Sequence, residues 1–115
     1  YSFVENELIA ALPDLPAGRG DYGRASQGAA NALLSRLYLN AEVYKGTPEW
    51  QKAIDAADAV INSGNYNLTA NYADVFSPRN VNDPEHIFVA PFDEATGTGM
   101  NFAQMTLHYP SQLTY

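Results

Sequence analysis

The chain has 115 residues, 46% of them hydrophobic, which is enough apolar material for one small core but too little for two. Its 6 basic and 13 acidic residues give a net charge of −7, which argues against a nucleic-acid backbone or an anionic membrane surface as a direct partner. The absence of cysteine excludes disulfides and thiolate metal sites, and no apolar run approaches the ~20 residues that span a bilayer, so we expect no direct membrane insertion by this segment.

The first predicted element is a short amphipathic helix over residues 2–12. Ser2 is placed to act as its N-cap, and Glu5 stands three residues later, as in a capping box. Pro13, Pro16, Gly18 and Gly20 then predict a loop over residues 13–23.

Residues 24–63 carry the clearest pattern in the chain, which predicts two helices packed as an antiparallel hairpin. Apolar residues recur at spacings of three and four in each half, as expected for one face of a helix. The first stripe is Ala30, Leu33, Leu34, Leu37, Tyr38, Ala41 and Tyr44, and the second is Trp50, Ala53, Ile54, Ala57, Val60 and Ile61. Only residues 45–47 separate the halves, so the two helices must lie side by side.

The limits of the hairpin are also predicted from local residues. The first helix is expected to open at Arg24, capped by Tyr22 or Gly23, and Thr47 and Pro48 suit the N-cap and first position of the second helix. Gly64 follows the last periodic residue, which is typical of a helix end.

For three residues the sequence predicts how they pack in the hairpin. Trp50 is predicted to be buried between the helices, whereas an exposed indole would reopen it as a platform for a sugar ring. Gly28 and Ala57 are small, and we expect them at close contacts between the helices.

Downstream, residues 71–76 predict a short helical turn and residues 86–92 (HIFVAPF) a short β-strand, which Pro91 limits to a sheet edge. Asp83 and Glu85 lie in a turn rich in oxygen ligands. A solvated turn is the favoured interpretation of this pair, with calcium binding as the alternative. The expected fold is therefore mainly α, with one short strand and long loops.

Aromatic residues are abundant, with 8 Tyr, 5 Phe and 1 Trp, and such rings can cover the apolar faces of sugars. We expect most of them to be packing residues, among them Phe3, Tyr38, Tyr44, Phe76 and Phe88.

The predicted ligand-binding residues are Asn101, His108 and Tyr109, in the irregular stretch 100–115. They combine an amide, an imidazole and an aromatic ring, although a stretch that lacks its structural neighbours would look the same. Arg24 has a structural role as its favoured interpretation and ligand binding as the alternative. His86 and His108 are the only histidines, and neither belongs to a pattern typical of a catalytic triad, so we expect no enzyme, no catalytic residues, no metal site and no cofactor.

Two resemblances follow from ordered motifs. The second predicted helix, with a large aromatic followed by Ala three residues later, is similar to the second helix of a tetratricopeptide repeat, although no second copy is found. A longer series resembles the SusD/RagB family: Tyr22-Gly23-Arg24-Ala25-Ser26-Gln27-Gly28-Ala29-Ala30, Arg36-Leu37-Tyr38-Leu39-Asn40-Ala41, Trp50, Ala53-Ile54, Val60-Ile61-Asn62-Ser63-Gly64, Tyr72-Ala73-Asp74-Val75-Phe76 and Asn82-Asp83-Pro84-Glu85.

The family resemblance implies a glycan-capturing lipoprotein of the bacterial outer membrane with a tetratricopeptide-like helical core. It also implies a SusC-like TonB-dependent transporter as partner, and it makes residues 1–115 an internal segment of a larger domain, without the family's lipid-anchor cysteine. The alternative is a helical adaptor that binds a peptide or a protein. Which glycan or peptide is bound does not follow from the sequence.

Overall fold

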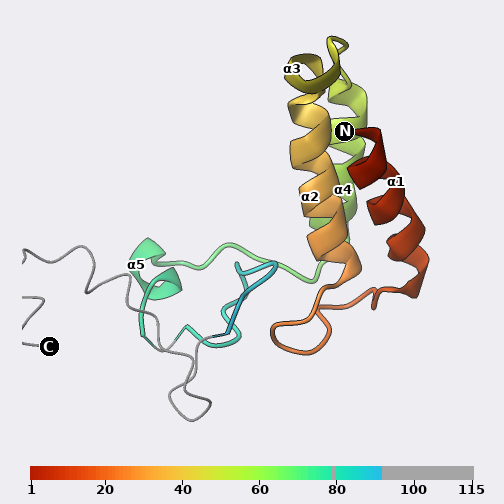
Figure 1. The fold of residues 1–115 in the computed structure, drawn as a ribbon. Helices are drawn as coiled ribbons and strands as arrows, with labels where there is room; N and C mark the ends of the chain where they lie inside the picture. Colours follow the sequence, from red (N-terminus) through yellow and green to blue (C-terminus); the bar gives the residue numbers. More distant parts are fainter. Residues whose placement is uncertain (79, 92–115) are drawn as a thin grey trace, which may run out of the picture.

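A computed structural model describes residues 1–78 and 80–91. Its elements are α1 (Ser2–Ala11), a 3₁₀ turn η1 (Leu12–Asp14), α2 (Gln27–Leu39), α3 (Ala41–Lys45), α4 (Trp50–Asn62) and α5 (Tyr72–Val75). Helices α1, α2 and α4 lie side by side as a small bundle, and the chain after α4 leaves this bundle to form a mostly irregular segment that carries α5 (Figure 1). The mainly α fold is confirmed.

The bundle is organised around the antiparallel pair α2 and α4, which make the most extensive contact in the fold. Its core consists of Leu34 and Tyr38 from α2 and Ala53 and Ala56 from α4. The Ser35 hydroxyl donates to the Ala53 carbonyl at 2.9 Å, so the two helices approach closely where α4 offers only methyl side chains. The predicted hairpin is therefore confirmed.

Helix α1 closes the open side of the core, because Leu8 and the following Leu12 pack against it together with Tyr1. The predicted N-cap is wrong: Ser2 is the first residue of the helix, and Tyr1 precedes it without a side-chain cap. A cluster of charged side chains joins α1 to the start of α4. In this cluster Lys52 pairs with Glu5 at 3.0 Å and with Glu49 at 2.8 Å.

Helix α2 begins later than predicted, because Ser26 is its N-cap in place of Tyr22 or Gly23. The Ser26 side chain accepts a hydrogen bond from Ala29 N, and its hydroxyl also lies 3.1 Å from that of Tyr66. Gly28 makes its close approach to Tyr66 rather than to α4, since a Cβ at this position would lie 2.6 Å from Tyr66 Cε2. The first helix is also broken at Asn40, whose side chain donates to the Arg36 carbonyl at 2.8 Å.

The prediction that Trp50 is buried is wrong, because its side chain is 58% exposed. Helix α4 begins at Trp50 with Glu49 as N-cap, not Thr47, and it turns Ala53, Ala56 and Val60 toward α2. The apolar pattern of this helix covers two adjacent faces, and the close contact with α2 selects the face that carries small residues. The other face leaves Trp50, Ile54 and Ile61 exposed.

Most of the expected packing aromatics are exposed as well. Tyr38 is buried as predicted, whereas Phe3, Tyr44, Phe76 and Phe88 are between 59% and 75% exposed.

The irregular segment contains the short helix α5, which confirms the predicted turn at residues 71–76. Asn71 caps it by accepting from Ala73 N, and Val75, the last residue of the helix, is buried. Residues 86–91 form no strand, so the predicted strand is wrong over the part that the structure describes. Here the His86 amide bonds to the Asp83 carbonyl in a turn, and the His86 carbonyl is taken by Arg19, so neither group is available for a sheet.

No helix within residues 1–78 and 80–91 is long and apolar enough to cross a membrane. The prediction that residues 1–115 form one segment of a larger domain stays a prediction.

Candidate functional site

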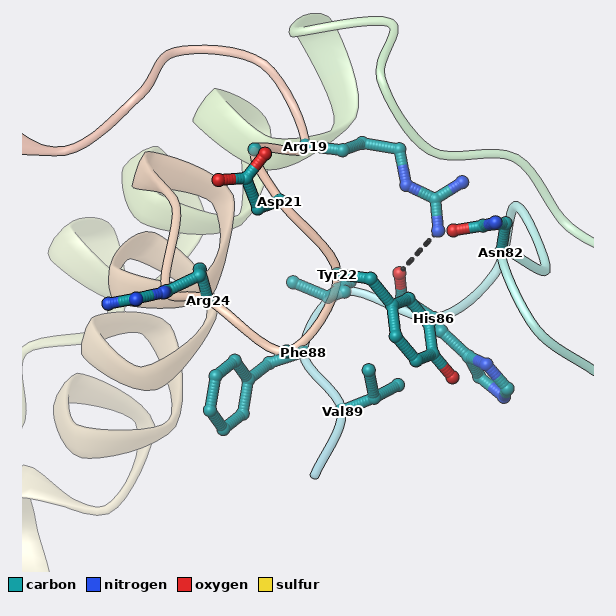
Figure 2. A pocket seen from close by; sticks show the side chains of 11 residues that line it. Arg19, Asp21, Tyr22, Arg24, Asn82, His86, Phe88 and Val89 are labelled. Carbon is teal, nitrogen blue, oxygen red and sulfur yellow. Dashed lines mark hydrogen bonds between the residues drawn. The ribbon is translucent and has the colours of Figure 1, made fainter. Parts of the chain in front are cut away.

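A pocket of about 260 Å³ with a mixed polar and apolar lining lies where the loop before α2 meets the irregular segment (Figure 2). We call it the loop pocket. Its walls come from two parts of the chain, residues 19–24 and residues 82–89. The side chains that line it are Arg19, Asp21, Tyr22, Arg24, Asn82, His86, Ile87, Phe88 and Val89.

The first wall owes its shape to two glycines. Gly20 and Gly23 have φ values of 69° and 80°, which side-chain-bearing residues rarely adopt. Gly23 is also a contact point, since a Cβ at this position would lie 2.9 Å from Pro91 Cδ. The loop can therefore lie directly against residues 89–91, and Tyr22 stands between the two glycines at the pocket.

Arg19 fastens this wall to the other one. Its Nη2 donates to the Asp83 carbonyl at 2.6 Å and to the His86 carbonyl at 3.1 Å, and the guanidinium lies 5.7 Å from the centre of the Tyr66 ring. A cation that satisfies two carbonyls and covers an aromatic ring has a structural role, so we assign Arg19 to holding the pocket together.

The second wall is a turn held by its own carboxylates. Asp83 Oδ1 accepts from the Glu85 amide at 2.9 Å and from the Thr69 hydroxyl at 2.7 Å, and these two bonds lower the pKa of Asp83. Glu85 Oε2 accepts from the Thr69 amide at 3.0 Å. These oxygens stabilise the turn, and the described residues contain no group of three or more His, Cys, Asp or Glu placed to hold a metal ion.

The pocket combines aromatic and polar groups. The side chains of Tyr22 and Phe88 are 42% and 59% exposed, so both rings are available to a ligand. In Figure 2 Tyr22, Asn82 and His86 lie on the same side of the pocket as the Arg19 guanidinium, with the His86 imidazole directed away from it, whereas Arg24 and Phe88 lie on the other side. His86 Nδ1 is buried without a hydrogen-bond partner in the described part of the chain. The described lining places the rings of Tyr22 and Phe88 beside an amide, an imidazole and a carboxylate, which are groups that can stack on a ligand and form hydrogen bonds with it.

A second cavity, of about 550 Å³, adjoins the loop pocket and differs from it in character. We call it the apolar groove. It lies between α1 and α2 and shares Ile87 and Phe88 with the loop pocket. Its remaining walls are formed by Leu8, Leu15, Leu33, several alanines and one charged residue, Arg36. Such a surface suits an apolar segment better than a hydroxylated ligand.

The exposed face of α4 is a third feature. Trp50, Ile54 and Ile61 lie along one side of the helix. The exposure of Trp50 reopens it as a platform for a sugar ring, but a line of aliphatic residues beside it is more typical of a face that packs against protein.

The predicted site residues Asn101, His108 and Tyr109 lie outside the described residues, and their role stays a prediction. Of the residues weighed from the sequence for binding or catalysis, Arg24 and His86 line the loop pocket. Sequence reasoning missed Tyr22, Asn82 and Phe88 as site residues. The sequence feature that could have identified one of them is the position of Tyr22 between Gly20 and Gly23, because an aromatic ring flanked by glycines in a loop is often exposed to solvent or ligand.

The sequence comparison identifies the class of protein. No family model matches the chain. The chain is similar to the starch-binding protein SusD of Bacteroides thetaiotaomicron, with 40% identity over 81 residues. The match covers 70% of this chain and 14% of the length of that relative. Over these residues the chain belongs to the SusD-like family, in agreement with its ordered motifs.

Proposed function

We propose that the protein binds glycans for nutrient capture in an outer-membrane polysaccharide uptake system. The observation that carries this proposal is the 40% identity to a starch-binding protein over 81 residues. The role is binding rather than catalysis, and it needs no cofactor.

The loop pocket supports this role by its chemistry. Sugar rings have apolar faces that stack on aromatic side chains, and hydroxyl edges that bond to amides, imidazoles and charged groups. The pocket brings exposed Tyr22 and Phe88 together with Asn82 and His86. The net charge of −7 also favours uncharged polymers over polyanions as ligands.

The proposed location is the outer membrane, through a lipid anchor outside this chain, and the proposed partner is a SusC-like TonB-dependent transporter. Both follow from the family resemblance. Co-purification of the full-length protein with a transporter encoded beside it tests the partnership, and a transporter that never co-purifies would count against it.

Affinity electrophoresis of the full-length protein tests glycan binding. Soluble starch is the first glycan to use, because it is the ligand named for the relative, and other neutral polysaccharides follow. We expect at least one of them to retard the protein, with bovine serum albumin as a non-binding control. Unchanged mobility in every gel would refute the proposed function.

A helical adaptor that binds protein is the second candidate function. The apolar groove and the exposed face of α4 favour it, since both are apolar surfaces rather than sugar-binding ones. The same electrophoresis separates the candidates, because an adaptor does not migrate more slowly in a polysaccharide gel.

A further inference from the structure

The size of the loop pocket limits what it can hold. Pockets that enclose a drug-sized ligand measure roughly 300–1,000 Å³, and this one has about 260 Å³. It therefore has room for a single sugar ring, and the rest of a polymer must extend beyond it.

The aromatic side of the pocket suits one stacked ring. Tyr22 is held in place by the loop backbone, where Arg24 N donates to the Asp21 carbonyl at 2.9 Å and Gly23 contacts residues 89–91. Tyr22 is 42% exposed, so its ring is accessible to a ligand. A rigid backbone under a free aromatic ring loses little entropy when a ligand stacks on it.

The charges in the pocket indicate the class of sugar. Recognition of an acidic sugar normally uses a free guanidinium, which binds a carboxylate through two parallel bonds. The Arg19 guanidinium already donates to two backbone carbonyls, and Arg24 shares the pocket with the carboxylate of Asp21. An acidic sugar would therefore find Arg19 committed to carbonyls and the Asp21 carboxylate in the same pocket, which leaves Arg24 as the one lining cation that could bind it. An uncharged sugar needs no such cation and can bond to the neutral amide of Asn82 and to His86.

We infer that the loop pocket is a subsite for one ring of an uncharged polysaccharide, which stacks on Tyr22 and bonds through its hydroxyls to Asn82 and His86. This inference rests on the proposed function and adds to it the residues and the chemical class of the ligand. It is independent of the predicted residues Asn101, His108 and Tyr109.

The test compares four forms of the full-length protein by affinity electrophoresis in soluble starch, a mixed-linkage β-glucan, galactomannan and polygalacturonate. The forms are the wild type, Tyr22→Ala, Tyr22→Phe and Tyr72→Ala. Tyr72 is the matched control, because it is 74% exposed and lies outside the pocket. We expect Tyr22→Ala to weaken binding to the retarding neutral glycan about fivefold, while Tyr22→Phe keeps the ring and Tyr72→Ala leaves the pocket intact.

A second variant guards against misfolding of Tyr22→Ala, which circular dichroism would detect. Asn82 has a φ of 61°, so Asn82→Gly removes the amide while keeping a backbone that glycine readily adopts. We expect this variant to lose about threefold or more in affinity, as removal of one hydrogen-bonding group does.

The outcomes separate the inference from the proposed function. Retardation of the wild type with no loss in Tyr22→Ala or Asn82→Gly would overturn the subsite and leave glycan capture standing. Retardation by polygalacturonate alone would overturn the uncharged class. No retardation in any gel would overturn both.

Discussion

The helical bundle and the irregular segment that follows it are stabilised in different ways. In the bundle the core is apolar, and Leu34 and Tyr38 are 3% and 6% exposed. In the segment over residues 63–91, Val75 is the one buried side chain among the described residues. The segment is held instead by polar bonds, such as those from Asn80 to the Val75 carbonyl at 2.7 Å and from Asn65 to the Ala17 carbonyl at 3.0 Å.

This difference indicates that the bundle is the scaffold and that the irregular segment carries the site. Regular helices use their backbone groups internally, whereas an irregular chain leaves backbone and side-chain groups to be arranged around a ligand. Polar contacts such as Arg19 with Asp83 and Ser26 with Tyr66 tie the segment to the bundle and its loop. The predictions below test this division, from the largest expected effect to the smallest.

The apolar core should be sensitive to truncation. Leu34→Ala is expected to lower the free energy of unfolding by about 2–5 kcal/mol, because the side chain is fully packed and leaves a cavity. The neighbouring Leu33 is 48% exposed, so Leu33→Ala is the matched control and should cost far less. Urea denaturation measures both, and equal losses would contradict the assignment of the core face.

Loss of the Arg19 side chain should destabilise the irregular segment locally and leave the bundle unchanged. Arg19→Met removes two charge-assisted bonds to carbonyls and should increase amide hydrogen exchange of residues 83–89 by about tenfold, corresponding to ~1.4 kcal/mol. The bundle amides should be unaffected. Arg24→Met is the control, because no described residue forms an ion pair with Arg24.

The charged cluster that joins α1 to α4 should give a smaller, pH-dependent effect. Bonds from Lys45, Lys52 and the Tyr1 hydroxyl hold the pKa of Glu49 at about 2, below its ordinary 4.5. A carboxyl whose pKa is lowered by folding stabilises the fold above its unfolded pKa, and this contribution is lost as the pH falls from about 4.5 to about 2.

Thermal melts of the wild type and Glu49→Gln from pH 7 to pH 2 measure this contribution. The gap between the two proteins should be widest near neutral pH, should begin to narrow as the pH falls through about 4.5, and should close near pH 2. Added salt should narrow it, because Lys45 and Lys52 are partly exposed. A gap that does not change with pH would show that the cluster contributes no charge-dependent stability.

The smallest effect is expected at the exposed face of α4. Trp50→Ala should change the free energy of unfolding by no more than about 0.5 kcal/mol, as surface substitutions usually do. Denaturation of the 115-residue chain measures it, and a loss as large as that of Leu34→Ala would place the indole in the core after all.

The sequence predicted the bundle better than the segment. Periodicity located α2 and α4 and their antiparallel arrangement, because a helix places every third or fourth residue on one face. Periodicity did not predict how α4 is rotated about its own axis, because Trp50 and Ala53 both fit an apolar pattern. The contact of Ala53 with Ser35 on α2 shows that the face with Ala53 is the buried one. The cap at Ser26 was missed for a similar reason, because its bond to Tyr66 joins residues forty positions apart.

The site was harder to predict than the fold. The loop pocket depends on Arg19 reaching carbonyls more than sixty residues away and on Gly23 contacting Pro91, and neither contact leaves a periodic signal in the sequence. The same contacts explain why residues 86–91 failed as a strand: their composition favours extended backbone, but Arg19 takes the His86 carbonyl that a neighbouring strand would need.

The division between scaffold and site is tested most directly by amide hydrogen exchange of the full-length protein with and without its retarding glycan. If the loop pocket binds the glycan, protection should increase in residues 19–24 and 82–89 and stay constant in α2 and α4. Protection confined to α4 around Trp50, with residues 19–24 and 82–89 unchanged, would contradict the account and place the glycan on the helical face instead.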